Sequence, residues 1–383
     1  MCDILKHTTM KTGDKTMKKI HRTLSLFTVA AMCAALLCSC GAVPDSSQTD
    51  SSSKAATTTT ADTTADTTTT GDASSTASAT SAPDSSVSDS SSAVTDDTNT
   101  NGITPAMWKV TSPEGNTMVM LGSFHALKDE CYPLPQAVTN AYNNADILAV
   151  ECDITSTSED GEYMKNLMKQ MLYNDNTKLS QHISEEAYSA LKTYLGYWGM
   201  DISALEVYRP WAVSSTLDTL LIQDSGFDTE KGLDNYLLTT AHADGKEIYE
   251  VESVDFQMNL LINFSDDIYD LMFRSFEGET KESQKQALED LYTAWKSGDI
   301  ETFLEEDNEE ELAGYTEEDK KTAEDYNNQM LYDRNKNMAK AAEDLMSQGK
   351  NVFYVVGAAH YAGEGGIIDL LEKDGYTAER VQY

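Results

Sequence analysis

Two histidines follow apolar runs through the same short pattern of a glycine, any two residues and the histidine. The first copy, "MVMLGSFH", places His125 three residues after Gly122, and the second, "FYVVGAAH", places His360 three residues after Gly357. A glycine at a strand end allows a tight turn and a close approach of the backbone to a ligand. Residues just beyond the carboxyl ends of strands face the crevice in which α/β sheets bind ligands. The repeated pattern therefore predicts that both imidazoles point into one space.

Two neutral imidazoles and one carboxylate would hold a divalent metal ion, with Mn, Co and Zn as the expected metals. Glu151 is the best carboxylate, because it ends the apolar run of residues 147–150, where a charge is costly unless it is paired. Glu252, at the end of the stretch "KEIYEVES", is a second candidate. Two alternatives stay open: the histidines could cap their own loops, and Glu151 could form an ordinary salt bridge.

Arg334 lies on the apolar stripe of the predicted helix "MLYDRNKNMAKAAEDLM", with Leu331 and Met338 at spacings of three and four residues. A buried guanidinium needs a carboxylate, a phosphate or a developing oxyanion as its partner. We therefore expect Arg334 to stabilise an oxyanion or to bind a substrate carboxylate, although its long side chain could instead reach the surface.

The composition excludes some functions. With 28 basic and 64 acidic residues the net charge is −36, which argues against nucleic acid and against direct contact with anionic lipid. The sequence has no H-E-x-x-H, no G-x-S-x-G and no P-loop, so the common hydrolase and nucleotide signatures are absent.

The stretch "MKKIHRTLSLFTVAAMCAALLCSCG" predicts a secretory signal, because a basic start precedes an apolar run too short to span a membrane comfortably. Its last tetrad, Leu-Cys-Ser-Cys, resembles the lipobox of bacterial lipoproteins and assigns Cys40 to lipidation. Residues 1–40 are then the signal peptide, with Met17 as the expected true start. An ordinary cleaved signal with an incidental cysteine is the alternative.

Residues 41–101 consist almost entirely of Ser, Thr, Ala and Asp. Such a stretch has no large apolar groups to offset its ordering entropy, so we expect a disordered linker. Residues 102–383 then form the folded domain, held by the lipid anchor at the extracytoplasmic face of the cell membrane. Cys131 and Cys152 lie in this domain and could form a disulfide outside the cytoplasm.

The two ends of the folded part share one unit: strand, G-x-x-H, loop, helix, strand. A largely helical insertion separates the two copies, which predicts a mixed α/β domain. Strands are predicted over 108–111, 117–121, 147–150, 352–356 and 377–382 and in "KEIYEVES". Helices are predicted over 135–143, 158–173, 184–196, 209–224, 232–244 and 366–373, with Gly245 as a stop, and over most of 265–348, with breaks at Gly298 and Gly314.

Taken together, these motifs resemble the TraB/GumN family, which includes the bacterial pheromone-shutdown proteins and the animal Tiki proteases. The likeness rests on "MVMLGSFHALKDECYPLPQAVTNAYNNADILAVECD" near one end and on "RNKNMAKAAEDLMSQGKNVFYVVGAAHYAGEGGIIDLLEKDGYTAERV" near the other. The blocks "YRPWAVSS", "GLDNYLLTTAHADGKEIYEVESVDFQ" and "YTAWKSGD" between them agree with it. The resemblance covers residues 107–381.

The resemblance implies a Tiki-like fold and metal-dependent cleavage of peptides or protein N-termini. It places metal binding on His125, His360 and Glu151, and catalysis on Glu151 and Arg334. Glu252 and Gln257 match another family block as possible additional site residues, and the loop glycines are Gly122, Gly357 and Gly363. The expected protein is a membrane-anchored metal-dependent peptidase. The alternative is a protein that sequesters a peptide without cutting it, as the pheromone-shutdown relatives suggest.

Overall fold

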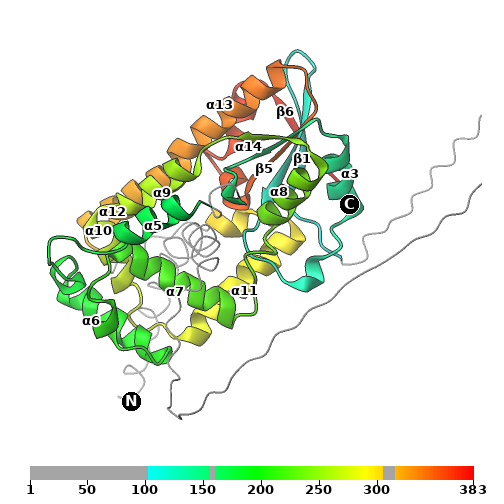
Figure 1. The fold of residues 1–383 in the computed structure, drawn as a ribbon. Coiled ribbons are helices and arrows are strands. Elements are labelled where there is room, and N and C mark those ends of the chain that lie inside the picture. Colours follow the sequence, from blue (N-terminus) through cyan, green and yellow to red (C-terminus); the bar gives the residue numbers. More distant parts are fainter. Residues whose placement is uncertain (1–101, 156–159, 305–314) are drawn as a thin grey trace, which may run out of the picture. The chain divides into compact units, whose positions relative to one another are not determined.

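The computed structural model describes residues 102–155, 160–304 and 315–383 (Figure 1). The predicted signal peptide, the start at Met17, lipidation at Cys40, the linker over 41–101 and the break at Gly314 lie outside these residues. No helix among the described residues is long and apolar enough to cross a membrane.

The described part of the chain contains a six-stranded mixed sheet with the strand order β4-β3-β5-β2-β1-β6. Strands β4, β3, β5 and β2 run parallel to one another, and β1 pairs antiparallel with β2 on one side and with β6 on the other. The strands are β1 (Met107–Thr111), β2 (Thr117–Ser123), β3 (Ile147–Val150), β4 (Glu247–Glu250), β5 (Val352–Gly357) and β6 (Thr377–Arg380). The prediction of a mixed α/β fold is confirmed.

The neighbouring interior strands β3 and β5 are apolar along their whole length, "ILAV" and "VFYVVG", and every one of their residues is buried. Continuous apolar runs are typical of parallel strands that are covered on both faces. The edge strands β4 and β6 are mostly exposed and carry Glu and Arg side chains. The pattern of apolar and charged residues therefore distinguishes these interior strands from the edge strands.

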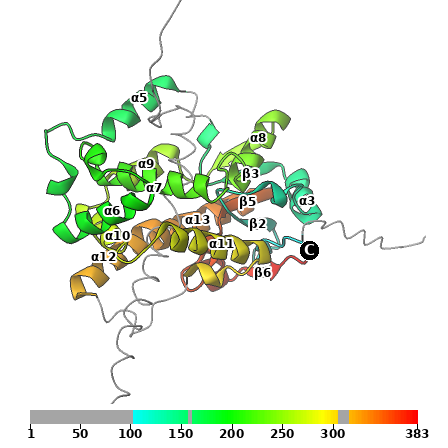
Figure 2. The same ribbon diagram turned by 90° about the horizontal axis from the view of Figure 1, so that it is seen from below.

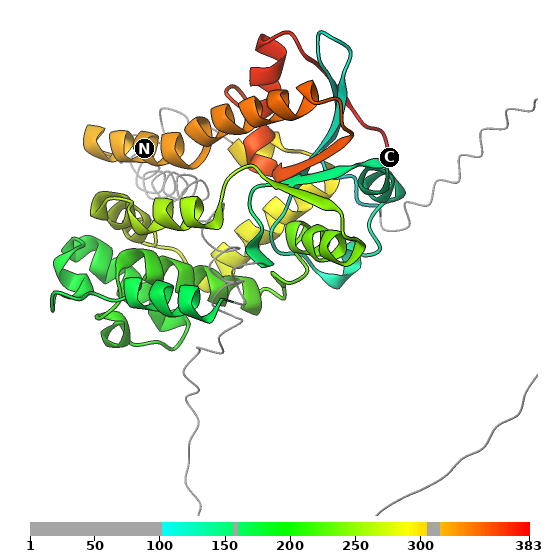
Figure 3. The ribbon, with the colours of Figure 1, turned by 45° about the horizontal axis from the view of Figure 1, so that its top comes forward.

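Helices cover both faces of the sheet. Helices α13 and α14 lie on one face and α3 and α8 on the other (Figure 3). The Tyr354 hydroxyl in β5 donates to the carbonyl of Met338 in α13 at 2.9 Å, and the Tyr142 hydroxyl in α3 donates to Asp244 in α8 at 2.9 Å. The helices on the faces are α3 (Gln136–Asn144), α8 (Leu233–Asp244), α13 (Asp333–Ser347) and α14 (Ile367–Lys373).

The other helices gather beside the sheet, and α11 extends from them toward it (Figure 2). They are α5 (Gly161–Gln170), α6 (Glu185–Tyr197), α7 (Pro210–Asp224), α9 (Val254–Ile262), α10 (Asp266–Arg274), α11 (Lys281–Ser297) and α12 (Glu317–Asn327). The predicted stops at Gly245 and Gly298 are confirmed, because both end their helices in the left-handed region at φ +66° and +72°. Helix α9 and the break between α10 and α11 were not predicted.

Neither Cys131 nor Cys152 forms a disulfide, although both are buried. The Cys131 Sγ lies 2.9 Å from the Tyr292 hydroxyl, and the Cys152 Sγ lies 3.6 Å from Oε1 of Gln257. The two thiols therefore contact different parts of the fold, and the pairing left open by the sequence is not present.

Asp218, in α7, is buried, and its Oδ2 has no hydrogen-bond partner among the described residues. Burial raises the pKa of this carboxyl well above its usual range. The unfolded chain loses the Asp218 proton near pH 4, whereas the folded chain keeps it to a higher pH. Folding stability is therefore lost as the pH rises from about 4 toward the raised pKa of the folded chain.

Asp218→Asn removes this titration. We compare the free energy of unfolding of the variant with that of the wild type at about pH 4.5 and at about pH 8. The variant's advantage should be larger at the higher pH, by roughly 1.4 kcal/mol for each unit by which burial raises the pKa of Asp218 within this range. Urea unfolding at both pH values measures the difference. A difference between the two proteins that does not change with pH would contradict the assignment.

Candidate active site at the carboxyl edge of the sheet

Four of the predicted site residues follow four neighbouring parallel strands. Glu252, Glu151, His360 and His125 come just after β4, β3, β5 and β2 respectively, in the order in which these strands lie in the sheet. The carboxyl ends of parallel strands meet at one edge. Residues more than two hundred positions apart in the sequence are thereby brought together.

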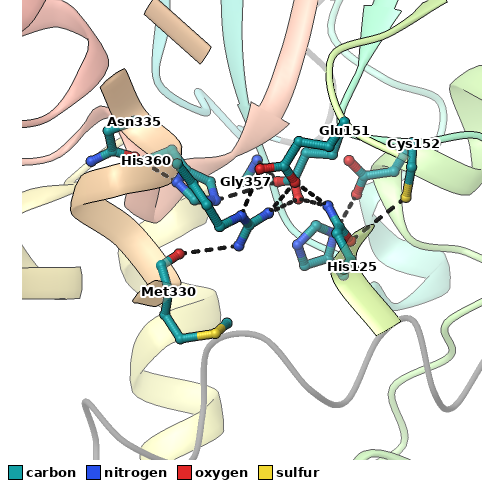
Figure 4. A network of polar contacts seen from close by, with 11 residues as sticks. His125, Glu151, Cys152, Met330, Asn335, Gly357 and His360 are labelled. Atoms are coloured by element: carbon teal, nitrogen blue, oxygen red, sulfur yellow. Dashed lines mark hydrogen bonds and ion pairs between the residues drawn. The ribbon is translucent and has the colours of Figure 1, made fainter. Parts of the chain in front are cut away.

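Gly357, the last residue of β5, lies at the centre of this group. A Cβ placed on Gly357 would lie 3.1 Å from Oε1 of Glu151, 3.4 Å from Nε2 of His125 and 3.6 Å from Cδ2 of His360. Figure 4 shows the three side chains around Gly357. We call His125, Glu151 and His360 the Gly357 cluster. The prediction that both imidazoles point into one space is confirmed.

His125 is held by a residue of α8. Its Nδ1 lies 2.7 Å from Oδ2 of Asp234, in the first turn of that helix. Burial disfavours the charged ring, but the Asp234 carboxylate outweighs it and raises the pKa of His125 to about 9. Because Asp234 occupies Nδ1, the ring turns its Nε2 toward Gly357.

His360 is held by α13. Its Nδ1 lies 2.6 Å from Oδ1 of Asn335, and the Asn335 amide donates in turn to the carbonyl of Gly365 at 2.9 Å. An amide oxygen only accepts, so Nδ1 carries the hydrogen and Nε2 faces Glu151 Oε1 at 3.7 Å with its lone pair. Burial and the nearby Arg334 charge lower the pKa of His360 to about 3, so the ring is neutral at pH 7.

Glu151 receives three hydrogen bonds. Its Oε1 accepts from the backbone N–H of Gly357 at 2.7 Å, and its Oε2 accepts from Arg334 at 2.8 Å and from Gln257 at 2.9 Å. Burial opposes ionisation, but the Arg334 guanidinium outweighs it and holds the pKa of Glu151 well below its usual range. Glu151 is therefore an ionised carboxylate in a fixed orientation.

Arg334 is only 3% exposed, so its predicted burial is confirmed and the alternative of a surface-reaching side chain is wrong. Its Nε and Nη2 donate to the two oxygens of Glu252, each at 2.8 Å, and Nη1 donates to the carbonyl of Met330 at 3.1 Å. Gln257 donates to Glu252 at 2.6 Å as well as to Glu151. Glu252 and Gln257 therefore belong to the same buried network.

Gly122 and Gly363 do not contact the Gly357 cluster directly. A Cβ on Gly122 would lie 3.0 Å from the Cα of Ala358, so glycine lets the turn that carries His360 pack against β2. Gly363 lies in the following loop with φ +62°. The prediction of Gly122 as a loop glycine is wrong, because Gly122 lies within β2, whereas Gly363 does lie in a loop.

A model of the TraB/PrgY/gumN family matches residues 106–380. The chain belongs to this family. Similar proteins include "Metalloprotease TIKI homolog" of Nematostella vectensis, 25% identical over 293 residues (65% of this chain, 61% of the relative), and "Metalloprotease TIKI1" of Danio rerio, 23% identical over 285 residues (64% and 57%). "Uncharacterized protein YbaP" of Escherichia coli (strain K12) is 24% identical over 159 residues (41% and 56%). The matched region thus spans between 56% and 61% of these relatives. No solved structure shows a significant match.

Within the described residues of this TraB/PrgY/gumN chain, no group of three or more His, Cys, Asp and Glu side chains is assembled as a metal site. The donor chemistry of the Gly357 cluster nevertheless fits a divalent ion. Each imidazole is fixed through Nδ1 and directs Nε2 into the cluster, the arrangement that partner residues impose on metal-binding histidines. A bound ion would displace the proton that the raised pKa keeps on His125. Oε1 of Glu151 accepts one hydrogen bond and keeps a second acceptor position.

A pocket of about 30 Å³ opens beside this cluster. It is lined by His125, Glu151, Cys152, Ile154, Thr229, Asp234, Asn235 and Gln257. This volume accommodates about one water molecule. Its lining includes Asp234 and Asn235 in the first turn of α8 and Gln257 of α9.

Two functional residues were missed from the sequence. Asp234 lies in the quoted block "GLDNYLL", just inside the start of a predicted helix, and Asn335 directly follows Arg334. Each forms a hydrogen bond with the Nδ1 of a histidine in another element of the fold. The sequence shows only a polar residue at a helix start in one case and a polar residue beside a buried arginine in the other. The other two histidines among the described residues, His182 and His242, pair with Asp266 at 2.9 Å and Asp153 at 2.8 Å.

Proposed function

We propose that the chain is a metal-dependent hydrolase that cleaves peptides. The observation that carries the proposal is the convergence of His125, Glu151 and His360 on Gly357. The names of the Tiki relatives, which describe metalloproteases, support the same reaction class. The proposal includes display outside the cell through a lipid on Cys40, which rests on the leader sequence.

His125, His360 and Glu151 would hold the ion. A bound divalent ion supplies a Lewis acid that lowers the pKa of water and polarises a carbonyl. Asp234 and Asn335 keep both Nε2 atoms directed at the same place. Glu151 stays ionised, and because Arg334 and Gln257 fill the acceptor positions of Oε2, the one position left on Oε1 would take the ion.

Arg334 takes a different role from the oxyanion binder that the sequence suggested. Three of its donor bonds go to Glu151 and Glu252, and a fourth goes to the backbone. We therefore assign Arg334 to holding the two carboxylates in place. Its guanidinium also keeps the pKa of Glu151 low, so that this ligand remains an anion.

The full-length chain, loaded in turn with Mn, Co or Zn, is incubated with a mixture of synthetic peptides, and mass spectrometry identifies the products. We expect new fragments that no longer form after a chelator is added, and about one bound ion per chain. His125→Ala combined with His360→Ala is expected to lose both the ion and the turnover, because it removes two of the three donors.

The matched control is His182→Ala combined with His242→Ala, because these histidines also pair with aspartates but lie outside the Gly357 cluster. This variant should keep its metal and its activity. Equal metal content in the His125/His360 variant and the wild type would contradict the proposed ligands. Stoichiometric removal of an intact peptide would instead identify the sequestering protein.

A further inference from the structure

Ser123, the last residue of β2, has a buried hydroxyl with no partner. The residue is 2% exposed, and its Oγ has no hydrogen-bond partner within the described part of the chain. Most buried hydroxyls are hydrogen bonded, because an unpaired one is costly. Two other buried serines follow this rule: Ser215 donates to Trp211 O at 2.9 Å and Ser275 to Met272 O at 2.6 Å.

The sheet register places Ser123 next to the Gly357 cluster. Ser123 pairs with Gly357 between the parallel strands β2 and β5. Register partners on neighbouring strands direct their Cβ atoms to the same face of a sheet. The Cβ direction of Gly357 leads to Oε1 of Glu151 and Nε2 of His125. The Ser123 hydroxyl therefore leaves β2 on the face where these groups meet.

We propose that the Ser123 hydroxyl binds a water molecule that it shares with Oε1 of Glu151. A hydroxyl both donates and accepts, so it can complete a water site that a carboxylate alone leaves open. Glu151 Oε1 has an acceptor position left beyond its bond from Gly357 N–H. The pocket of about 30 Å³ is lined by Glu151 and His125 but not by Ser123, so it shows room for one water on the carboxylate side of the proposed site. This water satisfies the otherwise unpaired hydroxyl.

The catalytic meaning of this water rests on the proposed function. If the chain hydrolyses peptides, the ion would take the free acceptor position of Glu151 Oε1, and the Ser123 hydroxyl would then hold the water beside that ion, where it is placed to attack the substrate carbonyl. Ser123 is then a water-positioning residue. The binding of the water is a separate statement, and it can be tested without any activity.

The first test is a high-resolution crystal structure of the full chain and of Ser123→Ala and Ser123→Thr. We expect an ordered water within hydrogen-bond distance of both Ser123 Oγ and Glu151 Oε1 in the wild type. The Thr variant should keep this water and the Ala variant should lose it. A Ser123 hydroxyl bonded to a protein group instead, or a water unchanged in Ser123→Ala, would overturn the proposal.

The second test is kinetic. With a cleaved peptide as substrate, Ser123→Ala is expected to lower kcat roughly tenfold to a hundredfold with KM within about twofold, because the loss concerns the reacting water rather than substrate binding. Ser123→Thr should recover most of kcat. Ser225→Ala, which removes another unpaired buried hydroxyl outside the cluster, should leave kcat unchanged.

The two tests distinguish a failure of the proposed function from a failure of the proposed role of Ser123. If the wild type cleaves no peptide, the proposed function fails, while the crystallographic water still decides the role of Ser123. If the wild type cleaves peptides and Ser123→Ala has wild-type kcat, the catalytic role of Ser123 fails and the hydrolase proposal stands.

Discussion

Glu151→Gln is expected to lower peptide hydrolysis by more than roughly 10²-fold, because losing a ligand of the ion should cost at least as much as losing a residue that only orients a ligand. The carboxylate presents oxygen to three donors, from Gly357, Arg334 and Gln257. A glutamine has one oxygen, so its amide NH₂ must face either Gly357 N–H or the Arg334 and Gln257 donors. The variant loses both the negative charge that favours a metal and the fixed orientation of the side chain.

Steady-state hydrolysis of the best peptide substrate by the wild type and Glu151→Gln measures this loss. Glu364→Gln is the matched control, because it makes the same change four residues after His360 on a side chain that is 93% exposed. It should retain wild-type activity. A Glu151→Gln variant that hydrolyses the peptide at the wild-type rate, with wild-type metal content, would remove Glu151 from the site.

Arg334→Met is expected to destabilise the fold by about 3–5 kcal/mol, the cost of leaving a buried ion pair without one partner. The guanidinium is 3% exposed and compensates two carboxylates, Glu151 and Glu252, whose side chains are 10% and 5% exposed. Without Arg334, two negative charges would face each other in a buried space. Methionine fills a similar volume, so lost packing contributes little to the effect.

The free energy of unfolding in urea measures the effect, and a triple variant separates charge from shape. Adding Glu151→Gln and Glu252→Gln to Arg334→Met should recover part of the stability, because it removes both uncompensated charges. Arg274→Met is the control: Arg274 also pairs with two acids, Asp270 and Asp319, but its side chain is 33% exposed. Equal losses for Arg334→Met and Arg274→Met would show that burial of the network does not matter.

The positions of the candidate site could be predicted because they follow from strand ends. Apolar runs identify the interior strands, and both the repeated G-x-x-H pattern and the glutamates at strand ends then lie at the edge of the sheet. This reasoning found His125, Glu151, His360 and Glu252. Arg334 was found by a different signal, its place on the apolar stripe of a helix, and burial forces such a guanidinium to find carboxylates.

Other parts of the site had no local signal. Asp234 and Asn335 determine which nitrogen of each histidine is free, yet each is an ordinary polar residue in a helix. Their role depends on how α8 and α13 pack on the sheet, which sequence periodicity does not specify. The packing of Cys131 and Cys152 is decided in the same way, because each thiol contacts a helix from a distant part of the chain. Helix α9 is short and apolar, so its periodicity is weak.

The position of β5 between β3 and β2 affects the order in which the sheet can form during synthesis. This strand is the fifth along the chain, yet it lies between β3 and β2, which are made some two hundred residues earlier. A growing polypeptide can thus form both flanking strands long before the one that joins them exists, and contacts between such remote segments are slow to form. A nascent chain would carry His125 and Glu151 without their common neighbour. Insertion of β5 adds His360 and the Gly357 amide, so the step that completes the sheet also assembles the reactive groups.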